Sequence, residues 1–295
     1  MLSSLQTRFN HPNVRFYQQD QLIMVELKNS FGQATLTTNG ATLLSYIPQG
    51  GDDLLYVSQT AVYDGTKPVR GGVPVCWPWF GAHPTDAGQK AHGIARYELW
   101  QVEAVTSVGE QGEATQLTLS LTPNANTQKA WPHDFKLSLI VTLAEKLEVE
   151  LKGENLSQQD WTVSEALHTY FRVAQAPGLL ISGLEGASYF DKNRDFAEFT
   201  QTESLKLQAP MDCVYVDHSA AVKIHDQGRN ILIEKQNSAS TIVWNPGEQG
   251  VKSFADMPDA DYQVMLCVEA GNALQNSYTL AAGQSHSLKM WLSAQ

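Results

Sequence analysis

Apolar and polar residues alternate with a period of two along most of this chain. In residues 146–151 a charged side chain alternates with Leu or Val at every step. Such a segment is typical of a β-strand that packs one face against a core and turns the other to water. The same pattern predicts strands at residues 22–27, 34–37, 116–121, 136–143, 221–224, 231–234, 241–244 and 287–292.

Turn signals that contain glycine separate the predicted strands, at residues 39–40, 50–51, 226–228 and 282–284. No segment has the periodicity of a long amphipathic helix, and no strand–helix–strand rhythm appears. The pattern therefore predicts an all-β protein, a sandwich or barrel of many short strands. Because no flexible linker and no change of composition interrupts the chain, we expect residues 1–295 to form a single domain.

The overall charge limits the possible partners. Of the 295 residues, 42% are hydrophobic, which is enough for a sizeable core, and 20 Lys and Arg face 31 Asp and Glu, a formal net charge of −11. Nucleic acids and anionic membranes attract clusters of cations, and this chain has none in its sequence. We therefore expect it to bind neither. Any anionic ligand has to be held by a few cations placed locally.

Targeting and redox signals point to the cytoplasm. The N-terminal residues lack the charged start and apolar run of a signal peptide, and no stretch approaches the ~20 apolar residues of a membrane-spanning helix. The three cysteines, Cys76, Cys213 and Cys267, are far apart and odd in number, which indicates neither a disulfide framework nor a metal-binding motif. We expect free, buried thiols in a reducing compartment.

Residues 67–81 interrupt the strand pattern with three prolines, three glycines and three large aromatic residues. Trp77, Trp79 and Phe80 could stack on the apolar faces of a sugar or pack as a rigid core loop, and we expect at least one of them to line a cleft. Arg70 stands beside two glycines, and its planar guanidinium could hold two oxygens of an anion. The alternative for Arg70 is a solvated surface position.

Three further segments carry residues with useful chemistry. His92 and Arg96 lie close to the aromatic loop in sequence, and His92 is expected to be structural or to orient a substrate. His168 lies in a strand-like apolar run, where it could act as a general acid or simply be hydrogen-bonded. Glu269 ends another apolar strand, where a carboxylate is costly unless it is paired or used; otherwise it is a surface residue. Weaker, loop-like candidates are residues 211–215 and 244–247.

Taken together and in this order, these segments resemble the aldose 1-epimerase superfamily and, within it, the hexose-6-phosphate mutarotases. The resemblance runs from Arg70 to Gly271. It is carried by RGG at 70–72, PVCWPWFG at 74–81, HG and AR within 92–96, LHTYF at 167–171, Asp212 with VY at 214–215, WNPG at 244–247 and VEAG at 268–271.

The resemblance implies a large antiparallel β-sandwich of the galactose mutarotase-like type, with a cleft on one sheet. It implies that His168 and Glu269 are the catalytic pair, and that Arg70, Arg96 and Asp212 bind substrate. One departure is Ala91, because some relatives carry Gln immediately before the HG pair. One hydrogen bond to substrate would then be missing or come from another residue.

Interconversion of sugar anomers needs one proton removed from the C1 hydroxyl and one given to the ring oxygen. From ordinary pKa values of about 4.3 and 6.5, Glu269 is expected to be the base and His168 the acid, with no cofactor and no metal. We expect their polar ends to face one cleft, several ångströms apart and not hydrogen-bonded. Paired arginines bind a phosphate dianion much better than a hydroxyl, so Arg70 and Arg96 favour sugar phosphates.

The expected function is therefore mutarotation of a hexose 6-phosphate, D-glucose 6-phosphate in the first place, by a cytoplasmic monomer. Two alternatives remain: an epimerase of free aldoses with structural arginines, and a carbohydrate-binding sandwich without catalysis. A pure binder would need neither His168 nor Glu269. A metal site built from His83, His92 or His168 matches no ligand spacing.

Overall fold

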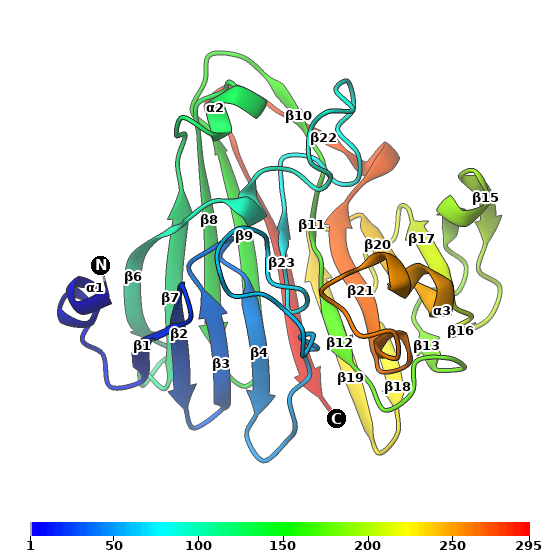
Figure 1. The fold of residues 1–295 in the computed structure, drawn as a ribbon, viewed down its shortest axis with the longest axis horizontal. Coiled ribbons are helices and arrows are strands. Elements are labelled where there is room, and N and C mark those ends of the chain that lie inside the picture. Colours follow the sequence, from blue (N-terminus) through cyan, green and yellow to red (C-terminus); the bar gives the residue numbers. More distant parts are fainter. Residues whose placement is uncertain (1) are drawn as a thin grey trace.

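The computed structural model describes residues 2–295, and β-strands make up most of its regular structure (Figure 1). Every strand that the alternation predicts is present, and all paired strands of the named sheets run antiparallel. The strands form two large sheets, of nine and eight strands, with a four-stranded and a two-stranded sheet. The prediction of an all-β antiparallel sandwich is confirmed.

The nine-stranded sheet forms one layer. Its strand β9 buries Leu147, Val149 and Leu151 and turns Glu148 and Glu150 outward, as the alternation predicts. In order across the sheet its strands are β16 (Leu205–Lys206), β13 (Leu180–Ser182), β18 (Val222–Asp226), β19 (Arg229–Gln236), β23 (Ser285–Ala294), β9 (Leu147–Asn155), β8 (Phe135–Leu143), β7 (Ala114–Leu121) and β6 (Gln101–Val108).

The eight-stranded sheet lies over one half of that layer and carries the cleft described below. Its strand β21 is buried at every residue, because β21 is covered on both faces. The order is β15 (Ala197–Thr200), β14 (Ser188–Asp191), β17 (Met211–Tyr215), β20 (Ser240–Asn245), β21 (Met265–Asn272), β11 (Glu165–Leu167) and β5 (Val75–Cys76), and β12 (Tyr170–Arg172) also pairs with β21.

The four-stranded sheet covers the other half of the nine-stranded layer, with β2 and β3 against β7 and β8 (Figure 1). Its strands are β1 (Val14–Gln19), β2 (Leu22–Asn29), β3 (Gly32–Thr37) and β4 (Leu43–Pro48), and the two-stranded sheet consists of β10 (Trp161–Val163) and β22 (Tyr278–Leu280). One cluster of buried side chains fills the space between the layers and reaches from Phe16 to Leu292 in sequence.

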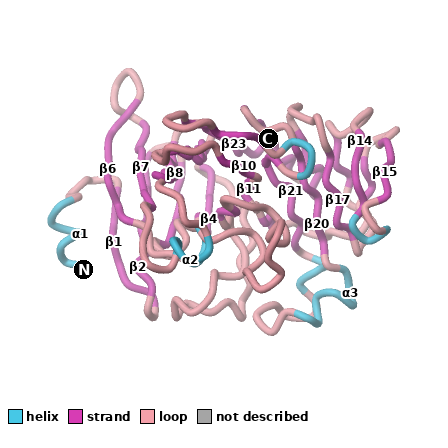
Figure 2. Tube along the Cα trace, turned by 90° about the horizontal axis from the view of Figure 1, so that it is seen from above, coloured by secondary structure: helices cyan, strands magenta, loops and turns pink. Residues whose placement is uncertain are grey.

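Helices are short and lie at the periphery (Figure 2). None within residues 2–295 is long and apolar enough to cross a membrane. The α-helices are α1 (Leu2–Arg8), α2 (Thr127–Ala130) and α3 (Gly247–Gly250), and the 3₁₀-helices are η1 (Ala95–Tyr97), η2 (Lys192–Arg194), η3 (Val251–Ser253), η4 (Asp261–Gln263) and η5 (Leu274–Asn276).

Trp77 anchors the aromatic loop, residues 67–81, in the core. Its ring is fully buried, with the ring of Phe135 at 4.8 Å and that of Trp161 at 5.8 Å. The backbone of Trp77 also bridges to Gly93, which has φ +76°. A Cβ on Gly93 would lie 2.0 Å from the Trp77 carbonyl oxygen, so only glycine allows the two segments to approach so closely.

We therefore expect Gly93→Ala to destabilise the protein more than Gly81→Ala. Both glycines have a left-handed φ, +76° and +79°, but a Cβ on Gly81 meets nothing within 4 Å. Gly81→Ala should cost only the left-handed strain, about 1–2 kcal/mol, whereas Gly93→Ala must also move backbone. Urea unfolding at equilibrium measures both losses. Equal losses for the two variants would show that the contact with Trp77 is not tight.

Candidate active site

A cleft with a volume of about 460 Å³ opens on the eight-stranded sheet and is lined by the two expected catalytic residues and the four residues expected to bind or orient substrate. Its size is that of a site for one small molecule. The predicted residues in its wall are His168, Glu269, Arg70, Arg96, His92 and Asp212, and further lining residues include Lys67, Phe80, Tyr170, Lys192, Trp244, Phe254 and Asp256.

His168 occupies a break between two strands, not the interior of one strand as the sequence predicts. β11 ends at Leu167 and β12 begins at Tyr170, and both pair with β21. At the break the His168 N–H donates to the carbonyl oxygen of Pro74, at 3.0 Å, in the aromatic loop. The imidazole is thereby held over β21 by backbone contacts on two sides.

Glu269 lies within β21, which continues to Asn272, so it is not the exposed strand end that the sequence left open. Side chains alternate along a strand, and Leu266, Val268 and Ala270 belong to the main core. Cys267 and Glu269 therefore share the opposite face, toward the cleft. Glu269 is only 1% exposed.

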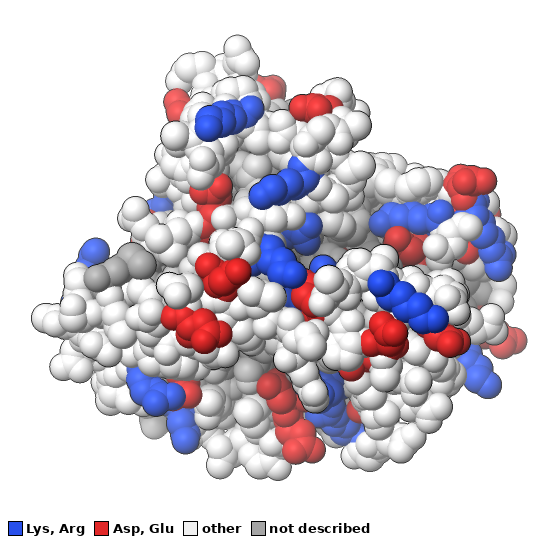
Figure 3. Space-filling model, in the orientation of Figure 1, with Lys and Arg blue, Asp and Glu red and all other residues white. Residues whose placement is uncertain are grey.

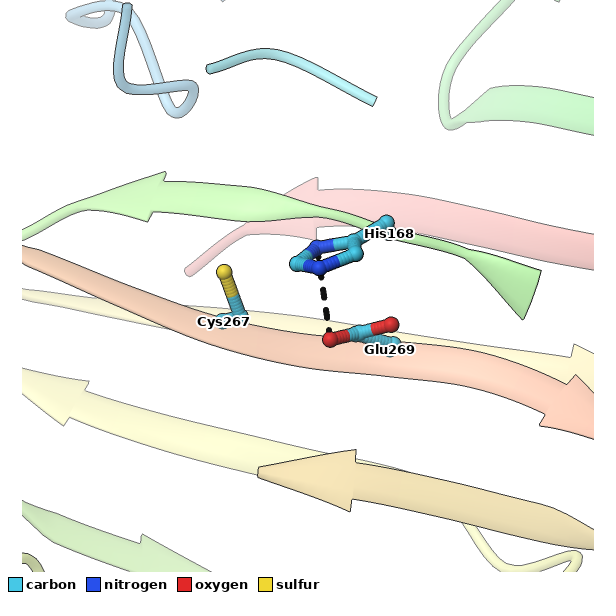
Figure 4. Close-up of side chains that lie close together, drawn as sticks. All are labelled: His168, Cys267 and Glu269. Atoms are coloured by element: carbon cyan, nitrogen blue, oxygen red, sulfur yellow. Dashed lines mark ion pairs between the residues drawn. The ribbon is translucent and has the colours of Figure 1, made fainter. Parts of the chain in front are cut away.

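The His168 imidazole faces the Glu269 carboxyl directly, with 3.3 Å between Nδ1 and Oε1 (Figure 4). The expectation of one shared cleft is right, but the expected separation of several ångströms is wrong, because the two backbones belong to directly paired strands. Neither atom has a hydrogen-bond partner in the described chain. Since Nδ1 is turned to Glu269, Nε2 is the ring nitrogen left to meet a substrate.

Aromatic rings fix the plane of this imidazole. The Tyr170 ring stacks on it with 4.9 Å between centroids and 11° between planes. Trp244 and His92 approach edge-on, at 6.1 and 5.4 Å. His168 is therefore free to exchange a proton but not to reorient without disturbing its neighbours.

Burial sets the protonation of the pair. It raises the pKa of the Glu269 carboxyl well above its ordinary value and lowers the pKa of the His168 imidazole well below its own, to which His92, Arg96 and Arg70 contribute further. Both shifts disfavour the charged form of each group. They oppose the carboxylate base and imidazolium acid expected from sequence, because ordinary pKa values ignore desolvation. Either arrangement, neutral or charged, holds one transferable proton.

The cations of the cleft are partly held by acidic side chains. Asp256, almost fully buried, accepts from Arg70 Nε and Lys67 Nζ, each at 3.1 Å. Burial acts to raise the pKa of Asp256, but Arg70 and Lys67 outweigh this and hold it below its usual value. Figure 3 shows basic and acidic side chains side by side around a hollow in this face. Asp256 therefore stays ionised and orients both cations.

Arg96, unlike Arg70, forms no salt bridge with an acidic side chain of the described residues. Its Nη2 donates to the carbonyl oxygen of Ala91 at 2.9 Å, while its Nε is buried and has no partner among residues 2–295. The side chain of Ala91 is exposed, so at this position the chain contributes only a carbonyl group that holds Arg96. An unpaired buried donor of this kind is suited to an anionic ligand.

The structure also tests the predicted positions of Asp212 and of the three aromatic residues. Asp212 lies on strand β17 and not on a loop, and its Oδ1 is 3.0 Å from Lys192 Nζ. Of the three aromatic residues only Phe80 lines the cleft, which confirms the expectation that at least one of them does so, whereas Trp77 and Trp79 are buried in the core.

The sequence also makes predictions for Trp244, the cysteines and His92. Trp244 lies at the end of strand β20, not in a loop. The three cysteines are free and buried, as expected. Burial, and after it the positive charge of Arg96, lowers the pKa of His92 to about 3. His92 is therefore a neutral ring in the wall of the cleft.

Lys67, Lys192 and Asp256 are the site residues that sequence reasoning missed. Lys67 is the first residue of the aromatic loop, which is a weak signal. Lys192 lies in η2 after β14, and Asp256 in a loop after η3. No local pattern distinguishes either residue from an ordinary surface charge.

We predict that His168 is a neutral imidazole at pH 7 in the free protein. A second His–Glu contact, His286 Nε2 to Glu165 Oε1, also measures 3.3 Å and provides an internal comparison. Burial acts to lower the pKa of His286, but the hydrogen bond and charge of Glu165, together with a backbone hydrogen bond with Asn237, outweigh it and raise the value. Ring ¹⁵N shifts through a pH titration should therefore show His168 neutral where His286 is still charged. An imidazolium signal from His168 at pH 7 would contradict the assignment.

Comparisons with known proteins give consistent results. The family model described as Aldose 1-epimerase matches residues 24–293. An Escherichia coli protein named "Putative glucose-6-phosphate 1-epimerase" is 32% identical over 270 residues, 90% of this chain and 89% of its own. A Salmonella typhimurium protein, whose crystal structure is described as that of a "putative mutarotase", superposes with a TM-score of 0.87 at 30% identity. The match covers 96% of this chain and 94% of the Salmonella chain. The galactose 1-epimerase of Lactobacillus acidophilus shares the fold alone, with a TM-score of 0.71 at 15% identity over 96% and 98%.

Proposed function

The chain belongs to the aldose 1-epimerase family, and we propose that it interconverts the α and β anomers of a hexose 6-phosphate, with D-glucose 6-phosphate as substrate. The observation that carries the proposal is that one cleft holds both a buried acid–base pair and a group of cations, and that each includes polar atoms without a hydrogen-bond partner among residues 2–295. The His168–Glu269 pair can move protons, and a group of cations with a free guanidinium nitrogen can hold a phosphate.

The pair performs ring opening without any other reactant. One member takes the proton of the C1 hydroxyl while the other gives a proton to the ring oxygen, and the bond between C1 and the ring oxygen breaks. The resulting aldehyde rotates about C1–C2, and closure on its other face returns both protons. Each group has to approach its own oxygen to about 2.6–3.2 Å. In the neutral form of the pair, activity falls at low pH when His168 gains a proton and at high pH when Glu269 loses one.

Four cations line this cleft in a protein with a net charge of −11: Lys67, Arg70, Arg96 and Lys192. Such a local excess supports an anionic substrate over a neutral sugar, for which unpaired arginine nitrogen would be a cost. Phe80 and Trp244 offer flat apolar walls for the C–H faces of a sugar ring. The relatives named as glucose-6-phosphate 1-epimerases agree with this choice of substrate.

A non-catalytic carbohydrate-binding role has less support. A carboxyl group that is 1% exposed and has no hydrogen-bond partner among residues 2–295 lowers the stability of the fold. A binding protein gains nothing from it, whereas a proton-transfer enzyme does.

We expect Glu269→Gln to lower kcat by about 10²–10⁴-fold, because the amide keeps the shape but cannot transfer the proton. The raised pKa of Glu269 gives the fold stability only at low pH, and this is lost as pH rises through the folded-state value. The variant should therefore be as stable as wild type or more stable, increasingly so toward alkaline pH. NMR exchange between the anomers and thermal unfolding at several pH values measure both effects.

The exposed Glu248, changed to Gln, is the matched control and should alter neither quantity. Near-normal mutarotation by the Glu269→Gln protein would refute the role of Glu269.

We expect Arg96→Ala to weaken the handling of glucose 6-phosphate, mainly through KM, by roughly 10- to 100-fold, the size of a lost hydrogen bond between charged groups. Arg70→Ala should act in the same direction. Activity on free glucose should change much less. Arg15→Ala serves as the control, because Arg15 is a surface residue with a 65% exposed side chain. An equal loss on both substrates would mean that the arginines hold the sugar ring or the fold.

A further inference from the structure

Cys267 is a third reactive side chain beside the proposed catalytic pair, and the reaction above does not use it. It precedes Glu269 by two residues on β21 and shares the cleft-facing side of the strand. Donor atoms of His168, Cys267 and Glu269 all lie within 4.8 Å of one another, and all three residues are buried. Figure 4 shows the thiol and the carboxyl rising from the same strand toward the imidazole.

Three buried polar atoms of this group lack a hydrogen-bond partner within residues 2–295. His168 Nδ1 and both carboxyl oxygens of Glu269 are buried without a hydrogen bond in the described chain. Leaving such atoms unsatisfied costs stability, and a cation that accepts lone pairs from all of them would remove that cost.

The donor types and spacing select the cation. Imidazole nitrogen, thiolate sulfur and carboxylate oxygen together form a ligand set for Zn²⁺ and related thiophilic ions, whereas Mg²⁺ and Ca²⁺ prefer oxygen alone. Bond lengths of about 2.0–2.3 Å place tetrahedral ligand atoms about 3.3–3.8 Å apart. The Nδ1–Oε1 distance of 3.3 Å already fits this, and the limit of 4.8 Å leaves at most about 1.5 Å of adjustment.

We propose that His168, Cys267 and Glu269 form an inhibitory site for Zn²⁺ or Cd²⁺, with a water molecule as the fourth ligand. On binding, the Cys267 S–H bond breaks, sulfur keeps the electron pair and donates it to the metal, and the proton goes to solvent. Glu269 likewise binds as a carboxylate. Nothing is oxidised or reduced. A metal on Nδ1 keeps the ring proton on Nε2, so the imidazole cannot accept a proton from the substrate. The metal-bound carboxylate has no proton to give, and an occupied site therefore cannot open a sugar ring.

The inhibition rests on the proposed function, but metal binding does not, and the experiment separates the two. The protein, freed of metal by a chelator, is titrated with Cd²⁺ and with Zn²⁺. The ultraviolet sulfur-to-cadmium charge-transfer band reports the thiolate ligand, and NMR anomer exchange reports activity. Mg²⁺ serves as the ion control. We expect one equivalent of Cd²⁺ to produce the band, and Zn²⁺ to abolish mutarotation until a chelator removes it.

Cys267→Ala should keep mutarotation, lose the band and weaken Zn²⁺ inhibition at least about tenfold. Cys213→Ala is the matched control, because Cys213 is an equally buried thiol on β17, and it should behave as wild type. If Cys267→Ala does not fold, ¹¹³Cd NMR of the wild-type protein decides instead, since a sulfur ligand shifts the resonance strongly downfield.

Absence of the band and of a sulfur-shifted ¹¹³Cd signal would overturn the site, and so would unchanged Zn²⁺ inhibition of Cys267→Ala. A band without any loss of activity would keep the metal site and overturn the inhibition together with the assigned catalytic pair.

Discussion

A carboxyl group buried in the middle of a fully covered strand is the constraint on which the site depends. β21 is buried at every residue, and Glu269 is nevertheless a residue with an ionisable side chain. Water cannot solvate this carboxyl, so the surrounding protein has to determine whether it holds a proton. Direct pairing of β11 and β12 with β21 places the His168 imidazole against it, and the aromatic rings around the imidazole keep that contact dry. The reactivity of the pair follows from the strand pairing of the fold.

The rest of the cleft offsets this burial at longer range. After burial, Lys192 is the largest influence on the pKa of Glu269 and lowers it, whereas Asp212, which pairs with Lys192, raises it. The group that would hold a substrate phosphate therefore also adjusts the proton affinity of the proposed catalytic carboxyl. In the proposed reaction, phosphate binding and proton transfer would depend on the same charges, which is consistent with cations that share one cleft with the pair.

The sequence predicts the fold well because its information is local. Alternation at residues 146–151 and in the other strands depends only on one packed and one wet face, and the structure follows it. The aromatic and histidine motifs likewise locate the loops that build the cleft. The break at His168 could not be predicted, because it depends on pairing with β21 and on the carbonyl of Pro74. Lys192 and Asp256 reach the site from distant loops that have no local signature. The opposite pKa shifts of Glu269 and His168 depend on a depth of burial that the sequence does not encode.

The pairing of Lys67 and Arg70 with Asp256 affects how easily the cleft is emptied. Counting Lys67, Arg70, Arg96 and Lys192 against Asp212 and Asp256, and taking Glu269 as neutral, the cleft carries 4 − 2 = +2 charges. A phosphate dianion would bring this sum to zero, so no surplus attraction would retain the product. Both anomers present the same phosphate to the same cations, and neither is favoured in the complex by that contact. Such a balance suits an enzyme that equilibrates two forms rapidly in both directions, for which strong retention of either form would slow turnover.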